Sequence, residues 1–413
     1  MLTPTARPLS DMQLSMLSHE AIVGRPIYNM PWAVRIVGEV DVQLLDRALL
    51  QVVRRHRVLC ARYDSGSAFP VPDPAPLLQT ITYNSRAEAL TALARLWATP
   101  IDVAVGVPLR ALLAQVAEAE SYFALSVHHV AGDSWSFGLL VDEVGRTYAA
   151  LRGAAPAAEP PPAPDFFDHA EEERSRTWDA GFWRQFLGDA RPTPYPRTEP
   201  VPDEEHCTLL ALDLGFGADD TRRIRSTARE ARVSPAAVLF AAVSIAVGDE
   251  GARASTLGVP AVLRDTRAQQ ETMGPLLNTL PVHTAWDGAS TGVELAQAHA
   301  RSMDAALAHK DVPYSRILKA AGFRRRPGSA PPFLHAVNID TEAPRLRLPG
   351  LRTETIPTPP QWAVFPAMWE FGWGAVGNVR GILRASRDAF TQDQAAICVD
   401  SFRAGLDRVL GGR

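Results

Sequence analysis

Two adjacent histidines and a nearby aspartate form the most chemically suggestive stretch of the chain, SVHHVAGDSWSF at residues 126–137. Histidine exchanges a proton near neutral pH, which makes it the usual general base. Because side chains alternate between the two faces of a strand, His128 and His129 point in opposite directions. We therefore predict no metal site here. One histidine should face a cavity and the other the packed interior.

Asp133 has two open roles at this point. The glycine-containing turn HVAGD lets the chain bring Asp133 back towards the histidines, where it could orient an imidazole directly. It could instead pair with an arginine and hold the turn rigid. A buried carboxylate without a partner would be costly, which favours the second role.

The elements that position this stretch alternate between strand and helix. Strands are expected at residues 31–40 and 121–127, and Asp41 can cap a helix that follows the first of them. Further helices are expected at residues 86–98 and after Asp133, whereas LRALLAQVAE is ambiguous. The second half of the chain repeats the alternation, with predicted strands around residues 255–262 and 277–284 and a closing helix at residues 392–409.

Composition narrows the class of protein. The chain has 413 residues, 46% hydrophobic and 21% charged, with a net charge of −4. This length favours two domains of similar size, and the Ala/Pro-rich segment at residues 151–165 is the best candidate for the crossing between them. There is no sustained basic run, no signal peptide and no apolar run long enough to span a bilayer, so we expect a cytoplasmic protein without nucleic-acid or membrane partners.

Five stretches, in order along the chain, carry a resemblance to a known family. They resemble the N-terminal helix motif and the RHExLRTxF, HHxxxDG, IGxFVNT and HQDxPFE motifs of condensation domains of nonribosomal peptide synthetases, members of the chloramphenicol-acetyltransferase-like superfamily. The stretches are LSDMQLSML (9–17), RRHRVLCARY (54–63), HHVAGDSW (128–135), MGPLLNTLPVHT (273–284) and AHKDVPYSRIL (308–318).

The resemblance implies an α/β (α+β) fold of two acetyltransferase-like lobes, arranged as a V-shaped pseudo-dimer with a central tunnel. We expect residues 1–164 to form the N-terminal lobe, which carries HHxxxD, and residues 165–413 the C-terminal lobe. Neither a carrier-protein motif nor an adenylation signature is found. The chain is therefore expected to be a free-standing condensation enzyme or an excised domain.

The resemblance also implies a reaction. Carrier proteins would present substrates on phosphopantetheine arms, no cofactor being bound tightly, and an acyl or aminoacyl thioester would react with an amine to form an amide. His129 maps to the catalytic histidine, as a general base or a positioner, while His128 and Asp133 support it. Ser134 and Trp135 complete the motif. Arg264 and Arg62 are candidate partners of Asp133, and Asn278 is either close to the site or a residue that satisfies backbone groups.

Departures from the family pattern keep other functions open. Ser134 replaces a glycine, which costs about 1 kcal/mol or more only if the backbone there needs a positive φ, and Ser134 could also cap the following helix. Arg57 and Cys60 replace a glutamate and an arginine, so an electrostatic contact has been lost or relocated. The alternatives are an acyltransferase that uses a carrier or CoA thioester to form an ester with a hydroxyl, and a catalytically silent recruitment module.

Overall fold

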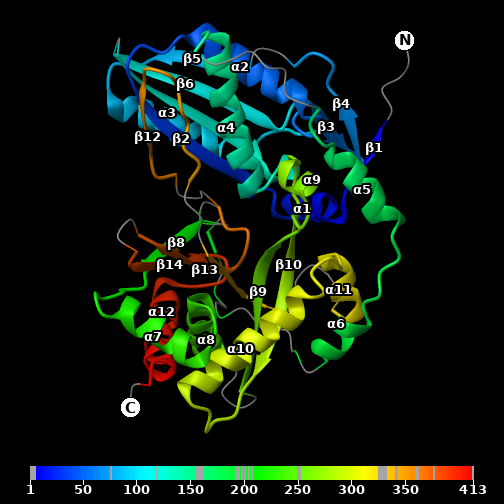
Figure 1. Cartoon of the computed structure of the whole chain (residues 1–413), viewed down its shortest axis with the longest axis vertical. Helices are drawn as coiled ribbons and strands as arrows, with labels where there is room; N and C mark the ends of the chain where they lie inside the picture. The colour runs from blue at the N-terminus through cyan, green and yellow to red at the C-terminus, as the bar shows by residue number, and fades with distance from the viewer. Residues whose placement is uncertain are drawn as a thin grey trace. The chain divides into compact units, whose positions relative to one another are not determined.

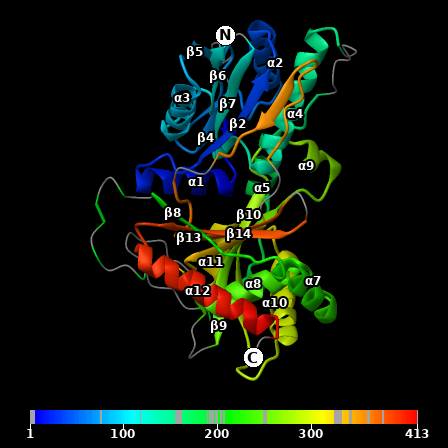
Figure 2. The same ribbon diagram turned by 90° about the vertical axis from the view of Figure 1, so that its left-hand side faces the viewer.

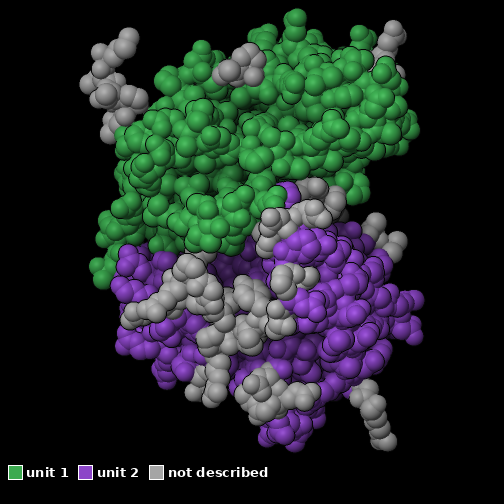
Figure 3. Space-filling view, turned by 180° about the vertical axis from the view of Figure 1, so that it is seen from behind, with its two compact units in different colours: residues 1–177, 263–277, 342–361 green, residues 178–262, 278–341, 362–413 purple. Residues whose placement is uncertain are grey.

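The computed structural model describes residues 6–74, 77–117, 119–154, 162–188, 190, 196, 199, 201, 202, 205, 208–248, 253–323, 333–339, 343–358, 362–374 and 377–411. These divide into two units (Figure 3). The first comprises residues 1–177, 263–277 and 342–361, and the second comprises residues 178–262, 278–341 and 362–413. The division differs from the predicted boundary after residue 164, because residues 165–177 stay with the first unit and two later segments return to it. Residues 155–161 of the expected crossing segment lie outside the described residues.

A five-stranded sheet organises the first unit (Figure 1), in the order β12-β2-β7-β6-β5. Its strands are β12 (Arg352–Thr355), β2 (Asn29–Val37), β7 (Glu120–His128), β6 (Leu109–Ala117) and β5 (Leu78–Thr82). The pairs β12–β2, β2–β7 and β7–β6 are antiparallel, and β6–β5 is parallel. The strands predicted at 31–40 and 121–127 are confirmed, and the ambiguous LRALLAQVAE is β6. The edge strand β12 comes from a segment far along the chain.

Helices cover both faces of this sheet (Figure 2). On one face, Phe123 and Leu125 share a core with α2 (Val42–Arg55) and α4 (Ser134–Leu151). On the other face, Tyr122 and Ala124 pack with α3 (Arg86–Ala98). The predicted cap of α2 is confirmed, since the Asp41 carboxylate accepts the Leu44 N–H at 3.0 Å.

Smaller elements complete the first unit. They are the helices α1 (Asp11–Val23), α5 (Phe166–Ser175) and α9 (Arg267–Glu271), and a three-stranded sheet of β1 (Arg7–Pro8), β4 (Ser67–Pro70) and β3 (Ala61–Asp64). Of these, α1 contacts His128 through Glu20, and α9 contacts Trp135 through the Gln270 carbonyl.

The second unit is built on a six-stranded mixed sheet in the order β10-β9-β11-β13-β14-β8. The strands are β10 (Leu277–Ala285), β9 (Ala254–Val262), β11 (His335–Ile339), β13 (Ala367–Trp373), β14 (Val379–Ser386) and β8 (Leu209–Asp213). Its helices are α6 (Gly181–Phe186), α7 (Asp220–Ala231), α8 (Pro235–Val247), α10 (Gly292–Leu307), α11 (Tyr314–Ala320) and α12 (Gln392–Val409). The closing helix has the predicted bounds.

The described helices include no single one long and apolar enough to cross a lipid bilayer. Together, α7 and α8 meet the length and composition requirement, but only as a pair bent by 100°. Most of α8 is buried in the core of the second unit.

Candidate active site

The two histidines lie where β7 ends and the chain turns towards α4. His128 is the last residue of β7, and residues His129–Ala131 form a short 3-10 turn, η1. Gly132 and Asp133 then lead into α4. The sequence motif therefore occupies a strand end, a turn and a helix start, and each of these elements places its side chain differently.

His128 is the histidine that faces the packed interior. Its side chain is 1% exposed. The ring Nδ1 accepts the Val130 N–H at 3.0 Å, and Nε2 lies 2.8 Å from a carboxylate oxygen of Glu20 on α1. Both ring nitrogens thus have protein partners, in line with the supporting role expected of His128.

His129 is half-buried and has a different environment. Its backbone N–H donates to the Tyr28 carbonyl at 2.8 Å, and its ring meets the Tyr28 ring edge to face, with centroids 6.2 Å apart. The buried Nδ1 has no hydrogen-bond partner among the described residues. Burial lowers the pKa of His129 below its ordinary value, and the Asp133 carboxylate opposes this shift. A neutral imidazole is therefore favoured at neutral pH, which is the form that can accept a proton.

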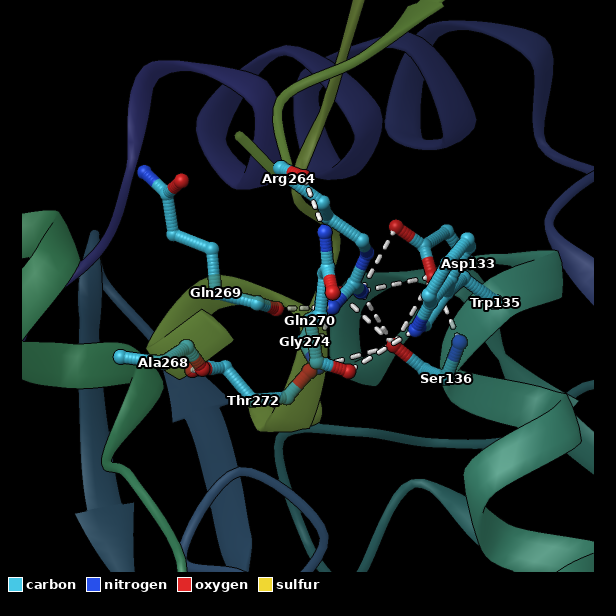
Figure 4. Close-up of polar contacts among 9 residues, drawn as sticks. All are labelled: Asp133, Trp135, Ser136, Arg264, Ala268, Gln269, Gln270, Thr272 and Gly274. Carbon is cyan, nitrogen blue, oxygen red and sulfur yellow. Dashed lines mark hydrogen bonds and ion pairs between the residues drawn. The ribbon is translucent and has the colours of Figure 1, made fainter. Parts of the chain in front are cut away.

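Asp133 caps α4 and pairs with Arg264 (Figure 4). Its carboxylate accepts the Ser136 N–H at 2.7 Å, and Arg264 Nη2 lies 2.9 and 3.0 Å from its two oxygens. Both side chains are buried, with Asp133 7% and Arg264 5% exposed. The other candidate, Arg62, instead lies 3.7 Å from Asp64 and over the ring of Phe69. Asp133 thus occupies the turn-holding role, one residue after the glycine that ends η1.

Arg264 joins the start of α4 to the segment that carries α9. Its Nη1 donates to the carbonyls of Gln269 and Thr272 at 2.6 Å each, and its Nη2 donates to the Gly274 carbonyl and to Ser136 Oγ at 2.9 Å each. Figure 4 shows these groups converging on one guanidinium. A single side chain therefore fixes a turn of backbone as well as the capping carboxylate.

Ser136 and Gly274 belong to this network, although neither was named as a site residue from the sequence. Ser136 Oγ lies 2.8 Å from both Asp133 Oδ1 and the Gly274 carbonyl, either of which can accept its proton, and it accepts the Gly274 N–H at 3.0 Å. Gly274 has φ +152°, and a Cβ there would lie 2.1 Å from a ring carbon of Phe166. Only glycine fits this position. The available signal was positional: Ser136 is the third residue after a helix-capping aspartate, and a cap of this kind accepts the backbone N–H at that position.

Ser134 and Trp135 lie on the exposed side of the same helix start. Ser134 is the first residue of α4, and it is absent from the described non-glycine residues with positive φ. The backbone therefore does not need the family's glycine. The expectation that Ser134 caps α4 is wrong, because Asp133 is the cap. Trp135 is 47% exposed, and its Nε1 donates to the Gln270 carbonyl at 2.9 Å.

Helix α1 supports the turn that follows β7. Its capping box is built from Ser10 and Gln13, and Gln13 Nε2 also donates to the Val130 carbonyl at 2.8 Å. Glu20, nearly two turns further along, reaches His128. These contacts join residues more than 100 positions apart, so no local pattern could have indicated them.

Asn278 lies in the second unit and satisfies backbone groups there. Its Nδ2 donates to the carbonyls of Lys310 and Val312 at 2.7 Å each, and its Oδ1 accepts the Thr279 N–H at 2.9 Å. These contacts match the second of the two expectations for Asn278, and the carbonyls belong to the loop after α10.

The two altered residues of the 54–63 motif, Arg57 and Cys60, have partners within the first unit. Arg57 Nη1 lies 3.0 Å from an oxygen of Asp165, while Cys60 Sγ donates to the Val71 carbonyl at 3.0 Å.

As for metals, no group of three or more His, Cys, Asp or Glu side chains that could hold an ion occurs within the described ranges.

Comparison with known proteins gives a consistent result. A family model described as "Condensation domain" matches residues 5–355. The chain is 28% identical over 348 residues to chondramide synthase cmdD of Chondromyces crocatus, covering 79% of this chain and 9% of that protein. It is also 28% identical over 357 residues to nonribosomal peptide synthetase kk1B of Curvularia clavata, covering 81% and 3%. The chain thus spans less than a tenth of the length of these relatives.

Solved structures share the fold. The X-domain from teicoplanin biosynthesis superposes with a TM-score of 0.86 at 22% identity, covering 100% of this chain and 97% of that one. The first condensation domain of the calcium-dependent antibiotic synthetase, in complex with a substrate analogue, gives 0.77 at 19% identity, covering 98% and 96%. The predicted mixed α/β fold of condensation-domain structures is confirmed.

Proposed function

Since this chain belongs to the condensation-domain family, we propose that it transfers an acyl or aminoacyl group from a carrier-protein thioester to an amine and so forms an amide. The observation that carries the proposal is His129, held at the end of β7 in an environment that lowers its pKa. A histidine kept neutral at working pH is ready to accept a proton. Carrier proteins would supply the donor, and the acceptor amine where it is carrier-bound, on phosphopantetheine arms.

The chemistry asks little covalent help from the protein, because a thioester is already activated. The neutral amine nitrogen attacks the thioester carbonyl carbon and forms the C–N bond. The C–S bond then breaks and releases the carrier thiol. His129 takes the proton that the nitrogen loses and returns it to the departing thiolate, so charge and protons balance. General base catalysis of this kind contributes about 10²–10⁴-fold, and holding the two reactants together supplies further acceleration.

The other motif residues act on the backbone around His129. Asp133 and Arg264 fix the start of α4, and His128 fixes the turn η1. Rigid support matters because a base must lie within hydrogen-bond reach of the proton that it abstracts. In this proposal His128, Asp133 and Arg264 position the base and do not touch the substrates.

Ester formation is the nearest alternative, because the same histidine could deprotonate a hydroxyl. A recruitment module without catalysis is the second alternative. It is suggested by the fold shared with the X-domain from teicoplanin biosynthesis, which has a solved complex with OxyB. The proposal and its two alternatives predict three different results in the same experiment.

The experiment loads a carrier protein with a thioester donor and offers amines and alcohols, with product detected by mass spectrometry. The wild-type protein should yield amide, and His129→Ala should reduce the initial rate by at least about 10²-fold. His283→Ala, a partly exposed histidine of β10 bonded to Thr256, is the matched control and should keep the wild-type rate. Ester without amide would establish the first alternative. No product from any acceptor would favour the recruitment module.

A further inference from the structure

The hydrogen bonds around His128 determine where its proton lies. The Val130 N–H is a backbone donor and cannot accept, so the Nδ1 atom that it contacts at 3.0 Å must offer a lone pair. The ring proton is therefore on Nε2, which lies 2.8 Å from Glu20 Oε2. An ionised carboxylate oxygen accepts hydrogen bonds and cannot donate one. His128 is thus a neutral imidazole in the Nε2–H tautomer.

This tautomer is also the cap of the turn that carries His129. His128 is the N-cap of η1, with φ −72° and ψ 133°, and its Nδ1 takes the place that a serine or aspartate oxygen takes in an ordinary helix cap. A proton on Nδ1 would point at the Val130 N–H, which is also a donor, and the hydrogen bond that caps η1 would be lost. The position of His129 then depends on which nitrogen of its neighbour holds the proton.

The Glu20 carboxylate contacts both the His128 ring and the backbone of Tyr28. One carboxylate oxygen accepts from His128 Nε2, and the other accepts the Tyr28 N–H at 3.3 Å. The Tyr28 carbonyl in turn accepts the His129 N–H at 2.8 Å. Glu20 therefore restrains the backbone around His129 in two ways. It holds the preceding residue through the His128 imidazole, and it holds Tyr28, whose carbonyl accepts the His129 N–H.

We propose that Glu20 is a positioning residue for His129, because it holds His128 in the Nε2–H tautomer whose Nδ1 caps the His129 turn. The kinetic consequences rest on the proposed transfer function. The tautomer itself does not, and it can be measured on the folded chain without any substrate.

The direct test is nuclear magnetic resonance of the full chain labelled with ¹⁵N-histidine. The chain has ten histidines, and the signal missing from His128→Asn identifies His128. At neutral pH the wild-type spectrum should show His128 protonated at Nε2 and bare at Nδ1. Glu20→Gln keeps an oxygen acceptor and should keep this pattern, whereas Glu20→Ala should lose it or show both tautomers. A wild-type ring protonated at Nδ1, or at both nitrogens, would overturn the proposal.

Two substitutions of His128 separate its two contacts. Asparagine places its oxygen near Nδ1 and can still cap the Val130 N–H, as asparagine does at turns. Glutamine reaches towards Nε2, where it can still contact Glu20, but leaves the turn uncapped. We expect His128→Asn to retain a kcat at least about 10-fold above that of His128→Gln, with similar KM, since a displacement near 1 Å costs about 10²-fold in rate. The reverse order would contradict the proposal.

The Glu20 variants give the same kind of comparison. Glu20→Ala should lower kcat by about 10–100-fold with little change in KM, and Glu20→Gln should stay within about 3-fold of wild type. An unchanged kcat in Glu20→Ala would refute the positioning role. If the wild-type chain forms no product at all, the transfer function fails, while the tautomer measurement still decides the proposal about Glu20.

Discussion

Removing the Arg264 guanidinium tests whether a buried ion pair holds the start of α4. We consider Arg264→Met, which keeps much of the side-chain volume and removes all six hydrogen-bond contacts with Asp133, Ser136 and the three backbone carbonyls. Asp133 would stay buried next to Ser136 without its counter-charge. Breaking a buried pair in this way costs about 3–5 kcal/mol of unfolding free energy.

Removing the charge of the other partner of the ion pair is expected to cost less unfolding free energy than Arg264→Met. Asp133→Asn keeps an oxygen that can accept the Ser136 N–H, and Arg264 retains its contacts with backbone carbonyls and with Ser136. We therefore expect a loss of about 1–3 kcal/mol, which is typical for a weakened buried hydrogen-bond set. In the double variant no unpaired charge remains, so its loss should fall short of the sum of the single losses by about 1.5–3 kcal/mol.

Differential scanning calorimetry of the four proteins measures these differences. For a unit of about 210 residues, each kcal/mol shifts Tm by roughly 2–4 °C, so Arg264→Met should lower the Tm of the first unit by about 6–20 °C. Strictly additive losses, or a loss below about 1 kcal/mol in Arg264→Met, would refute the reasoning, because either result means that Asp133 does not depend on Arg264 for its counter-charge.

Three further predictions concern single side chains. Burial lowers the pKa of His299 and of His335 to about 4, so the unfolded chain binds protons before the folded chain does as the pH falls. The unfolding free energy should therefore decrease below pH 6.5 by up to ~1.4 kcal/mol per pH unit for each ring. Urea titrations that give the same unfolding free energy at pH 7.5 and pH 5 would contradict this. Ser134→Gly should change stability by less than about 0.5 kcal/mol in thermal melts, since the position is exposed and has no positive φ; a clear gain would mean that serine strains the backbone. Asn278→Ala should cost about 2–4 kcal/mol because it leaves two backbone carbonyls unpaired, and Asn278→Asp, of the same shape but without the donor, should lose at least as much in chemical denaturation.

The parts of the fold that the sequence predicted carry their own local signals. The predicted helices α2, α3 and α12 each begin after a residue whose side chain accepts a backbone N–H of the first turn, namely Asp41, Ser85 and Thr391. By contrast, β6 stayed ambiguous because both of its faces are buried. Leu112 packs towards α3 and Leu113 towards α2 and α4, so no alternation of apolar and polar residues marks the strand.

The site was predictable where its residues are neighbours in the sequence. The strand end, the turn and the pairing of Asp133 with an arginine followed from HHVAGDSW and the cost of burying a charge. Glu20, Ser136 and Gly274 were missed because their roles depend on partners brought together by the fold, from α1 and from the segment around α9. The same long-range return of residues 263–277 and 342–361 explains why one boundary could not describe the units.

The edge strand β12 has a consequence for the newly made chain. Residues up to Thr177 supply most of the first unit, but the free edge of β2 is paired only when Arg352–Thr355 arrive, and Asp133 meets its guanidinium only when Arg264 does. At ~5–20 residues per second, the ribosome needs roughly 9–35 s between Thr177 and β12. During that interval β2 presents unpaired backbone groups of the kind that attract other strands. Chaperones that bind exposed strand edges can therefore reach β2 throughout that interval.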